Sequence, residues 1–148
     1  MKILLLTHMY ANPDRSDLGN HLPALQVFAQ WWTQAGHDVT VLQLYRHYGR
    51  DARVRVPLYG SRVARYEVDG VPVIRIECRY VARLSALTEP YFRRLARRAK
   101  ALLPAGVDVM LVHFPMALAG FADSLDAGCP RVMTLHSTDI ERLAAPGG

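Results

Sequence analysis

The sequence has 148 residues, of which 51% are hydrophobic and 21% charged, and its formal net charge is +5. This length fits a single domain, and this composition excludes a disordered chain. No apolar run approaches the roughly 20 residues of a membrane span, and the N-terminal run is too short for a signal peptide, so we expect a cytoplasmic protein. The two cysteines form neither a CxxC pair nor a disulfide framework, and we expect both to be reduced.

Positive charge is concentrated in the middle of the chain. Residues 46–100 hold 14 Lys/Arg against 5 Asp/Glu, whereas the rest holds 4 against 8. Such a segment is typical of a solvated surface, or of one that attracts a phosphorylated substrate, a membrane or nucleic acid. The Arg93–Lys100 face of an expected helix has the charge for electrostatic docking on anionic lipid. Without aromatic residues interleaved for stacking, it does not favour nucleic acid as a partner.

In chain order, the first elements are a strand, a helix and a strand. Ile3–Leu6 is a continuous apolar run, as expected for a strand covered on both faces. A helix is predicted from Asn20 or His21 to Ala35, and Val39–Leu44 is the second strand. The apolar stripe of this helix is predicted to consist of Leu22, Leu25, Ala29 and Trp32. These elements make a βαβ unit.

A loop over residues 45–60 and then a β-hairpin are expected next. Its strands, 64–68 and 71–76, flank Asp69-Gly70, a strong two-residue turn signal. Pro72 lacks an N–H group, which places its strand toward a sheet edge.

The second half of the chain continues the alternation of strands and helices. A helix is predicted over Glu89–Leu103, a strand over 107–112, a helix near Ala117–Ala127 and a strand over 131–135. The whole pattern predicts a Rossmann-like, doubly wound α/β fold, with a mainly parallel sheet and helices on both faces.

Two predicted strands each end in a histidine, His113 and His136. Polar residues just past the ends of parallel strands collect in one crevice, where an imidazole can bond a sugar hydroxyl or a phosphate oxygen. Asp139 is a candidate base, or merely the cap of a following helix. His8 and His21 border the same predicted crevice. An ordinary structural role is the competing interpretation for each histidine.

Several motifs of other enzyme classes are missing from the sequence. The first loop has only Gly19, so neither a dinucleotide fingerprint nor a phosphate loop is present. Gly19 either lets an anion approach backbone N–H groups or only makes a turn. The histidines show no metal-ligand spacing, so we infer no metal. No nucleophile elbow or cysteine–histidine signature occurs.

Taken in order, several segments resemble the N-terminal half of a group 1, family 4-like retaining glycosyltransferase with the GT-B fold. They are Met1–Thr7, the Pro13…Gly19 loop, Ala35–Val41, Asp69–Val73, Val107–His113, Gly128–Val132 and Thr134–Asp139. The Gly-His-Asp-Val and Thr-Leu-His-Ser-Thr-Asp segments are the most specific of these. The resemblance covers nearly the whole chain.

The resemblance implies half of a GT-B fold, with residues 1–148 as one N-terminal, acceptor-side domain of a truncated protein whose donor-binding domain is absent. Gly19 would approach the donor diphosphate, although Leu18-Gly19 stands where many members carry Gly-Gly. His136 would sit by the transferred sugar, with Asp139 as the second catalytic candidate. The expected substrate-binding residues are His8, Asn20, His21 and His113.

The function implied is transfer of a sugar, of hexosyl type, to a glycan or lipid-linked acceptor, as in polysaccharide biosynthesis. The nucleotide sugar is then a substrate, and we expect no cofactor. The alternative is a non-catalytic α/β binding module, or one subunit of a split glycosyltransferase. Because the sheet is expected to end at strand 131–135 with an uncovered edge, we also expect the chain to self-associate.

Overall fold

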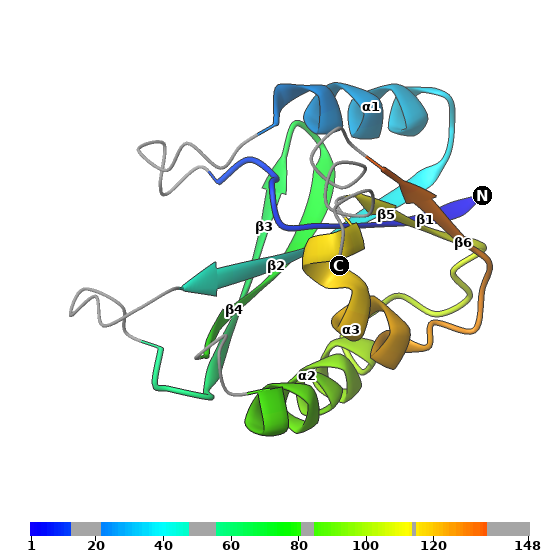
Figure 1. Cartoon of the computed structure of the whole chain (residues 1–148). Helices are drawn as coiled ribbons and strands as arrows, with labels where there is room; N and C mark the ends of the chain where they lie inside the picture. Colours follow the sequence, from blue (N-terminus) through cyan, green and yellow to red (C-terminus); the bar gives the residue numbers. More distant parts are fainter. Residues whose placement is uncertain (13–21, 48–55, 81–84, 114, 136–148) are drawn as a thin grey trace.

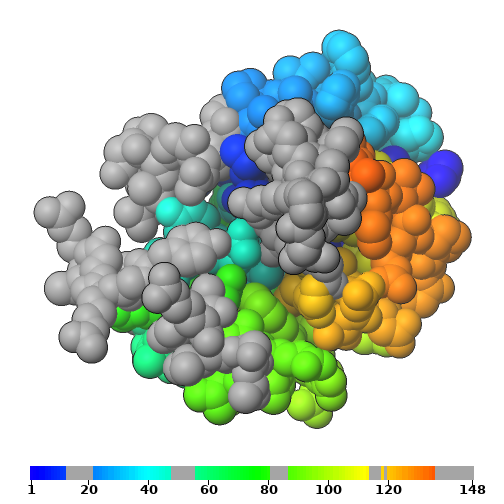
Figure 2. Space-filling view, in the orientation of Figure 1, coloured from blue at the N-terminus to red at the C-terminus, as the bar shows by residue number. Residues whose placement is uncertain are grey.

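The computed structural model describes residues 1–12, 22–47, 56–80, 85–113 and 115–135. It is a three-layer α/β structure, with one helix above a six-stranded sheet and two helices below it (Figure 1). The elements are β1 (Lys2–Thr7), α1 (Pro23–Gln34), β2 (Asp38–His47), β3 (Ser61–Val68), β4 (Val71–Arg79), α2 (Ser85–Lys100), β5 (Val109–His113), α3 (Pro115–Leu125) and β6 (Arg131–Thr134). Figure 2 shows α1 and α2 on opposite sides of the molecule.

The sheet is mainly parallel, as predicted. Its strand order is β3-β4-β2-β1-β5-β6, and only the β3–β4 pair is antiparallel. The chain first builds outward from β1 through β2, and later returns to place β5 on the other side of β1. The strand order therefore reverses between β1 and β5, which is where open α/β sheets form a crevice at their carboxyl ends.

Each face of the sheet has its own apolar core because successive side chains of a strand point to opposite faces. One core joins Leu4, Leu6, Leu42 and Leu44 to buried residues of α2 and α3. The other joins Ile3, Leu5, Val39 and Val41 to Leu25 and Ala29 of α1. These two cores confirm the predicted doubly wound architecture.

The hairpin is confirmed, but the predicted position of Pro72 is wrong. Asp69 and Gly70 both have positive φ, 50° and 79°, which the two-residue hairpin turn requires. β4 does not lie at the edge, because β3 covers one side of it and β2 the other. The proline is tolerated because pairing with β2 begins one residue later, at Val73.

Other element ends differ from the predictions by a few residues. β2 extends three residues beyond Leu44, into the expected loop. α2 begins four residues before Glu89, with Pro90 inside the helix rather than in its first turn. It ends at Lys100, where the N–H of Leu102 bonds the carbonyl of Ala99 at 2.8 Å and so tightens the last turn. Within the described residues, no helix is long and apolar enough to span a membrane.

Candidate functional site

A row of polar side chains crosses the sheet at the level where β1 and β5 end. Arg75 of β4 is paired in register with Gln43 of β2, and Gln43 with Thr7 of β1. His113 of β5 takes the next position. Leu6 precedes Thr7, Val112 precedes His113, and Leu6 and Val112 are register partners, so Thr7 and His113 lie side by side. Thr134 of β6 is in turn the partner of His113. Residues at one register position share a face, and this is the face that α1 covers nearer the amino ends.

This row contains most of the buried polar residues of the described structure. Thr7, Gln43, Arg75 and His113 are each at most 6% exposed, and His47 on the same face is 8% exposed. Burial of polar groups costs free energy unless they are bonded, so a core does not gather them without compensation. Their concentration at the crevice end of the sheet indicates a site for a polar ligand.

Gln43 anchors the backbone that follows β1. Its Nε2 donates to the carbonyl oxygen of Tyr10 at 2.9 Å, and its Oε1 lies 2.9 Å from the hydroxyl of Tyr66. The same hydroxyl lies 3.0 Å from the carbonyl oxygen of Ala11. The N–H of Met9 donates to Thr7 Oγ1 at 3.1 Å. Residues 8–12, at the start of the glycine-bearing loop, are therefore fixed on β1, β2 and β3.

Beyond Gln43, the same face carries a buried group of charged residues. The two carboxylate oxygens of Glu77 have different partners: Oε1 lies 2.9 Å from Arg75 Nη2, and Oε2 lies 3.3 Å from His47 Nε2. The Tyr66 ring lies 5.4 Å from Cζ of Arg75, within cation–π range. The His47 ring meets Tyr45 edge-on at 4.9 Å. The carboxylate thus ties β2 to β4 at the end of the sheet.

Two of the predicted site residues lie at the place where the strand order reverses. His8 directly follows β1, His113 ends β5, and these strands are neighbours. His8 is half-buried and His113 is buried. The structure therefore brings both to the predicted crevice, whereas their role toward a substrate stays a prediction.

The remaining predicted site residues lie outside the described residues. They are Gly19, Asn20, His21, His136 and Asp139. Asn20 or His21 was the predicted start of α1. The cap position is instead Leu22, which makes no side-chain hydrogen bond there, and Pro23 opens the helix.

Sequence reasoning missed Thr7, Gln43, Arg75, Glu77 and His47. A signal was available, because each interrupts or closes an apolar strand, as Gln43 does within Val-Leu-Gln-Leu. A fully buried strand of a parallel sheet is expected to be almost continuously apolar. A polar residue near the carboxyl end of such a strand is therefore a site candidate.

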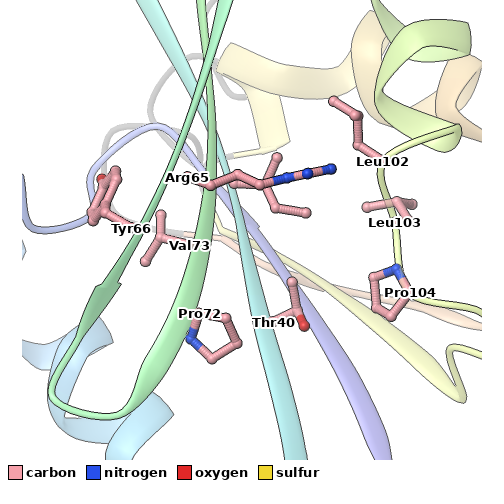
Figure 3. A pocket seen from close by; sticks show the side chains of 9 residues that line it. Thr40, Arg65, Tyr66, Pro72, Val73, Leu102, Leu103 and Pro104 are labelled. Atoms are coloured by element: carbon pink, nitrogen blue, oxygen red, sulfur yellow. The ribbon is translucent and has the colours of Figure 1, made fainter.

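A separate hollow of about 310 Å³ lies on the opposite face, nearer the amino ends of the strands. Thr40, Pro72, Leu102, Leu103 and Pro104 line it, and Figure 3 shows the Arg65 side chain reaching across it toward Leu102. The hollow is mostly apolar and holds none of the polar row. It therefore lies apart from the candidate site.

Neither cysteine has the features of a nucleophile. Both are free, as predicted. Burial is the main cause that raises the pKa of Cys78 to about 12, and burial likewise raises the pKa of Cys129. Since the thiolate is the reactive form, both thiols are held in their unreactive state at neutral pH.

The basic face of α2 lies on the other side of the sheet from the polar row. Arg93 pairs with Glu89, and Lys100 lies 3.2 Å from Asp126 Oδ2. Arg94, Arg97 and Arg98 are also exposed. Part of the charge on this face is thus balanced by carboxylates. Among the described residues, no cluster of three or more His, Cys, Asp or Glu side chains could hold a metal ion.

Comparison with known proteins gives one family and one solved structure. The family model described as Glycosyltransferase Family 4 matches residues 25–147. No curated protein matches the sequence. A solved E. coli structure, described as trehalose-6-phosphate bound with UDP-2-fluoro glucose, superposes with a TM-score of 0.45 at 10% identity. The match covers 84% of this chain but 30% of that one.

Proposed function

Because the chain belongs to Glycosyltransferase Family 4, we propose that it is the acceptor-side domain of an enzyme that transfers a sugar from a nucleotide-sugar donor. The observation that supports this best is the buried polar row of Arg75, Gln43, Thr7 and His113, which crosses four adjacent strands at the level where β1 and β5 end. A sugar is recognised through its hydroxyl groups, which need hydrogen-bond donors and acceptors around them. In this row, Arg75 supplies donors and the imidazole of His113 can donate or accept, whereas Gln43 is bonded to Tyr10 and Tyr66.

In this proposal the acceptor is a glycan or a lipid-linked molecule, the transferred group is a hexose, and the product belongs to polysaccharide biosynthesis. The donor is held mainly by a second Rossmann-like domain outside residues 1–148, as the family resemblance implies. Holding donor and acceptor in the reacting geometry supplies much of the rate of such a transfer. Residues 1–148 alone are then expected to transfer no sugar.

The catalytic roles follow from the same resemblance. His136 bonds a hydroxyl beside the reacting carbon, with Asp139 in the same loop as a second polar group. Gly19 lets the loop after β1 approach the donor diphosphate. His8, Asn20, His21 and His113 contact the substrates. The placement of His8 and His113 on neighbouring strand ends supports this arrangement.

Peripheral contact with a membrane, from the cytoplasmic side, is part of the proposal. The exposed arginines of α2, Arg94, Arg97 and Arg98, support it. Attraction of such residues to anionic headgroups is short-ranged and weakens with salt. α2 and the polar row lie on opposite faces of the sheet. Docking of α2 on a membrane therefore leaves the candidate site uncovered, on the side away from the membrane.

The test is the His136→Ala variant of the enzyme encoded by the complete reading frame. Loss of one well-placed polar contact in a closed site lowers kcat by about 10²–10³-fold. The melting temperature is expected to stay at the wild-type value, because a residue past a strand end contributes little to the core. A variant with full kcat contradicts the catalytic role, and one that loses activity by unfolding makes His136 structural.

The isolated chain provides the complementary measurement. Turnover of a nucleotide sugar by residues 1–148, above a His136→Ala control, would contradict the need for a second domain. A donor domain encoded in a separate neighbouring frame would show a split enzyme. A complete frame with no such domain would favour a binding module without transfer activity.

A further inference from the structure

One arginine of the polar row has more hydrogen-bond donors than the described residues satisfy. The Arg75 side chain is 7% exposed, and its Nη2 is the atom that contacts Glu77. Its Nε and Nη1 atoms are buried, and neither has a hydrogen-bond partner within the described part of the chain. A guanidinium carries five N–H donors, and buried donors without acceptors destabilise a fold. A group that accepts from Nε or Nη1 would remove this cost.

The charges around Arg75 favour an anion as that group. Arg79 and His47 lie on the same face near the carboxyl ends of β4 and β2, and Glu77 is the carboxylate among them. Arg79 is half-buried, and its Nη1 donates to the carbonyl oxygen of Val56 at 3.4 Å. Among the described residues of this face, two guanidinium groups and an imidazole thus lie near one carboxylate. The formal charge of this described group is positive, and it lies in partly desolvated surroundings where charge-assisted bonds are strong.

The position of Arg75 separates it from the reacting end of the site. Adjacent strands lie about 4.8 Å apart, so the Cα of Arg75 is roughly 10 Å from that of Thr7 and roughly 14 Å from that of His113. The donor diphosphate is proposed at Gly19, in the loop that follows β1. Arg75 lies two strands from β1, on the side away from β5. Because this chain is proposed to be the acceptor-side domain, we assign an anion at Arg75 to the acceptor.

We propose that Arg75 binds an oxyanion, a phosphate or carboxylate group, carried by the acceptor. This inference rests on the proposed glycosyltransferase function and names a chemical class for its acceptor. In the free protein, Glu77 holds the guanidinium in place through Nη2. The acceptor oxyanion takes the unbonded donors, and the acceptor extends along the row toward His113. Arginine suits this role because it stays charged when buried and bonds oxyanions through fixed donors.

The experiment measures oxyanion binding by the 148-residue chain, without sugar transfer. Inorganic phosphate and acetate are titrated at constant ionic strength, followed by calorimetry and by the melting temperature. We expect saturable binding of at least one of them, which Arg75→Met weakens by roughly 10- to 100-fold. The matched control is Arg65→Met, because Arg65 lies on the same hairpin, is exposed and faces the opposite side of the sheet. It should bind as the wild type does.

A second variant keeps the test decisive if Arg75→Met does not fold. Glu77→Gln keeps the shape of the side chain but removes the competing negative charge, so phosphate should bind several-fold more tightly. If Arg75 serves only to pair with Glu77, this variant gains no affinity and the proposal is wrong. Absence of saturable binding in the wild type also overturns it, and leaves the sugar-transfer proposal standing.

Three further measurements identify the substrate that carries the oxyanion. If a nucleoside diphosphate displaces phosphate from Arg75, the site belongs to the donor and the proposal is wrong. A soluble sugar phosphate that competes with phosphate, and whose binding Arg75→Met weakens, supports a soluble acceptor. Vesicles containing an anionic phospholipid support a lipid-linked acceptor if Arg75→Met, but not Arg65→Met, weakens their binding.

Discussion

The two edges of the sheet are built differently. β3 is eight residues long, and its exposed side chains include the charged residues Arg62, Arg65 and Glu67. β6 is four residues long and exposed throughout, and Val132 and Met133 are 52% and 48% exposed. Charged side chains keep an edge from pairing with another chain, whereas exposed apolar ones invite it. The comparison shows that β3 is a protected edge and that the β6 edge is suited to further contact.

The support beneath the two edges differs as well. Below the β5–β6 side lies α3, whose Phe121 is fully buried among Leu118, Ala122 and Leu125. On the β3 side, the hydroxyl of Tyr91 donates to the carbonyl oxygen of Gly60 at 2.5 Å. The β6 side combines this apolar packing with polar contacts, because Arg131 donates to the carbonyl oxygen of Ala122 at 3.3 Å and pairs with Asp123 at 2.9 Å. On the β3 side, the polar contact from Tyr91 reaches the backbone before the strand.

The largest expected effect comes from removing that apolar packing. Phe121→Ala leaves a cavity beneath β5 and should lower the free energy of unfolding by about 3–5 kcal/mol. Tyr91→Phe, on the β3 side, removes one hydrogen bond and should cost about 1 kcal/mol. Urea unfolding measures both, with Leu87→Ala as a control because that side chain is 55% exposed. Equal losses at Phe121 and Tyr91 would contradict the difference between the two sides.

The next effect concerns assembly. We expect the chain to self-associate through the β6 edge, and Val132→Lys should weaken this association about tenfold by placing a charge there. Glu67→Lys introduces the same side chain at the β3 edge, with a charge change of +2 where Val132→Lys gives +1, and should leave the association unchanged. Sedimentation over a concentration series measures both. A wild-type chain that stays monomeric at high micromolar concentration removes the basis for this expectation.

The smallest expected effect tests the turn that positions the β3 edge. Gly70 has a φ of +79°, and a Cβ placed there would contact nothing within 4 Å. Gly70→Ala should therefore cost only the backbone strain, about 1–2 kcal/mol.

Gly120 provides a comparison inside helix α3. A Cβ there also meets nothing within 4 Å, so Gly120→Ala should stabilise the protein by about 0.5–1 kcal/mol. Thermal unfolding shows whether each substitution raises or lowers the stability. A stabilising effect of Gly70→Ala would show that the turn relaxes.

Part of the candidate site was visible in the sequence, because it depends on chain order alone. Polar residues after strand-like runs marked His8 and His113, and a parallel sheet brings such positions to one edge. The charged group of Arg75, Glu77 and His47 was not predicted. Arg75 and Glu77 are neighbours on one face of β4, but only the β2–β4 register brings His47 within reach of Glu77. Pro72 was misplaced for the same reason, since a single sequence does not state which strand lies beside β4.

The sequence by itself determined the alternation of strands and helices, the Asp69-Gly70 turn and the placement of an apolar side on each element. These depend on interactions between residues close in the chain: hydrophobic periodicity, turn chemistry and the end of α1 at Gly36, whose φ is 84°. The tertiary structure decided the strand order, the row from Arg75 to His113 and the unequal edges. Those features depend on which distant segments share a face of the sheet. The free energy of burying both apolar faces at once decides that arrangement, and no local sequence pattern contains it.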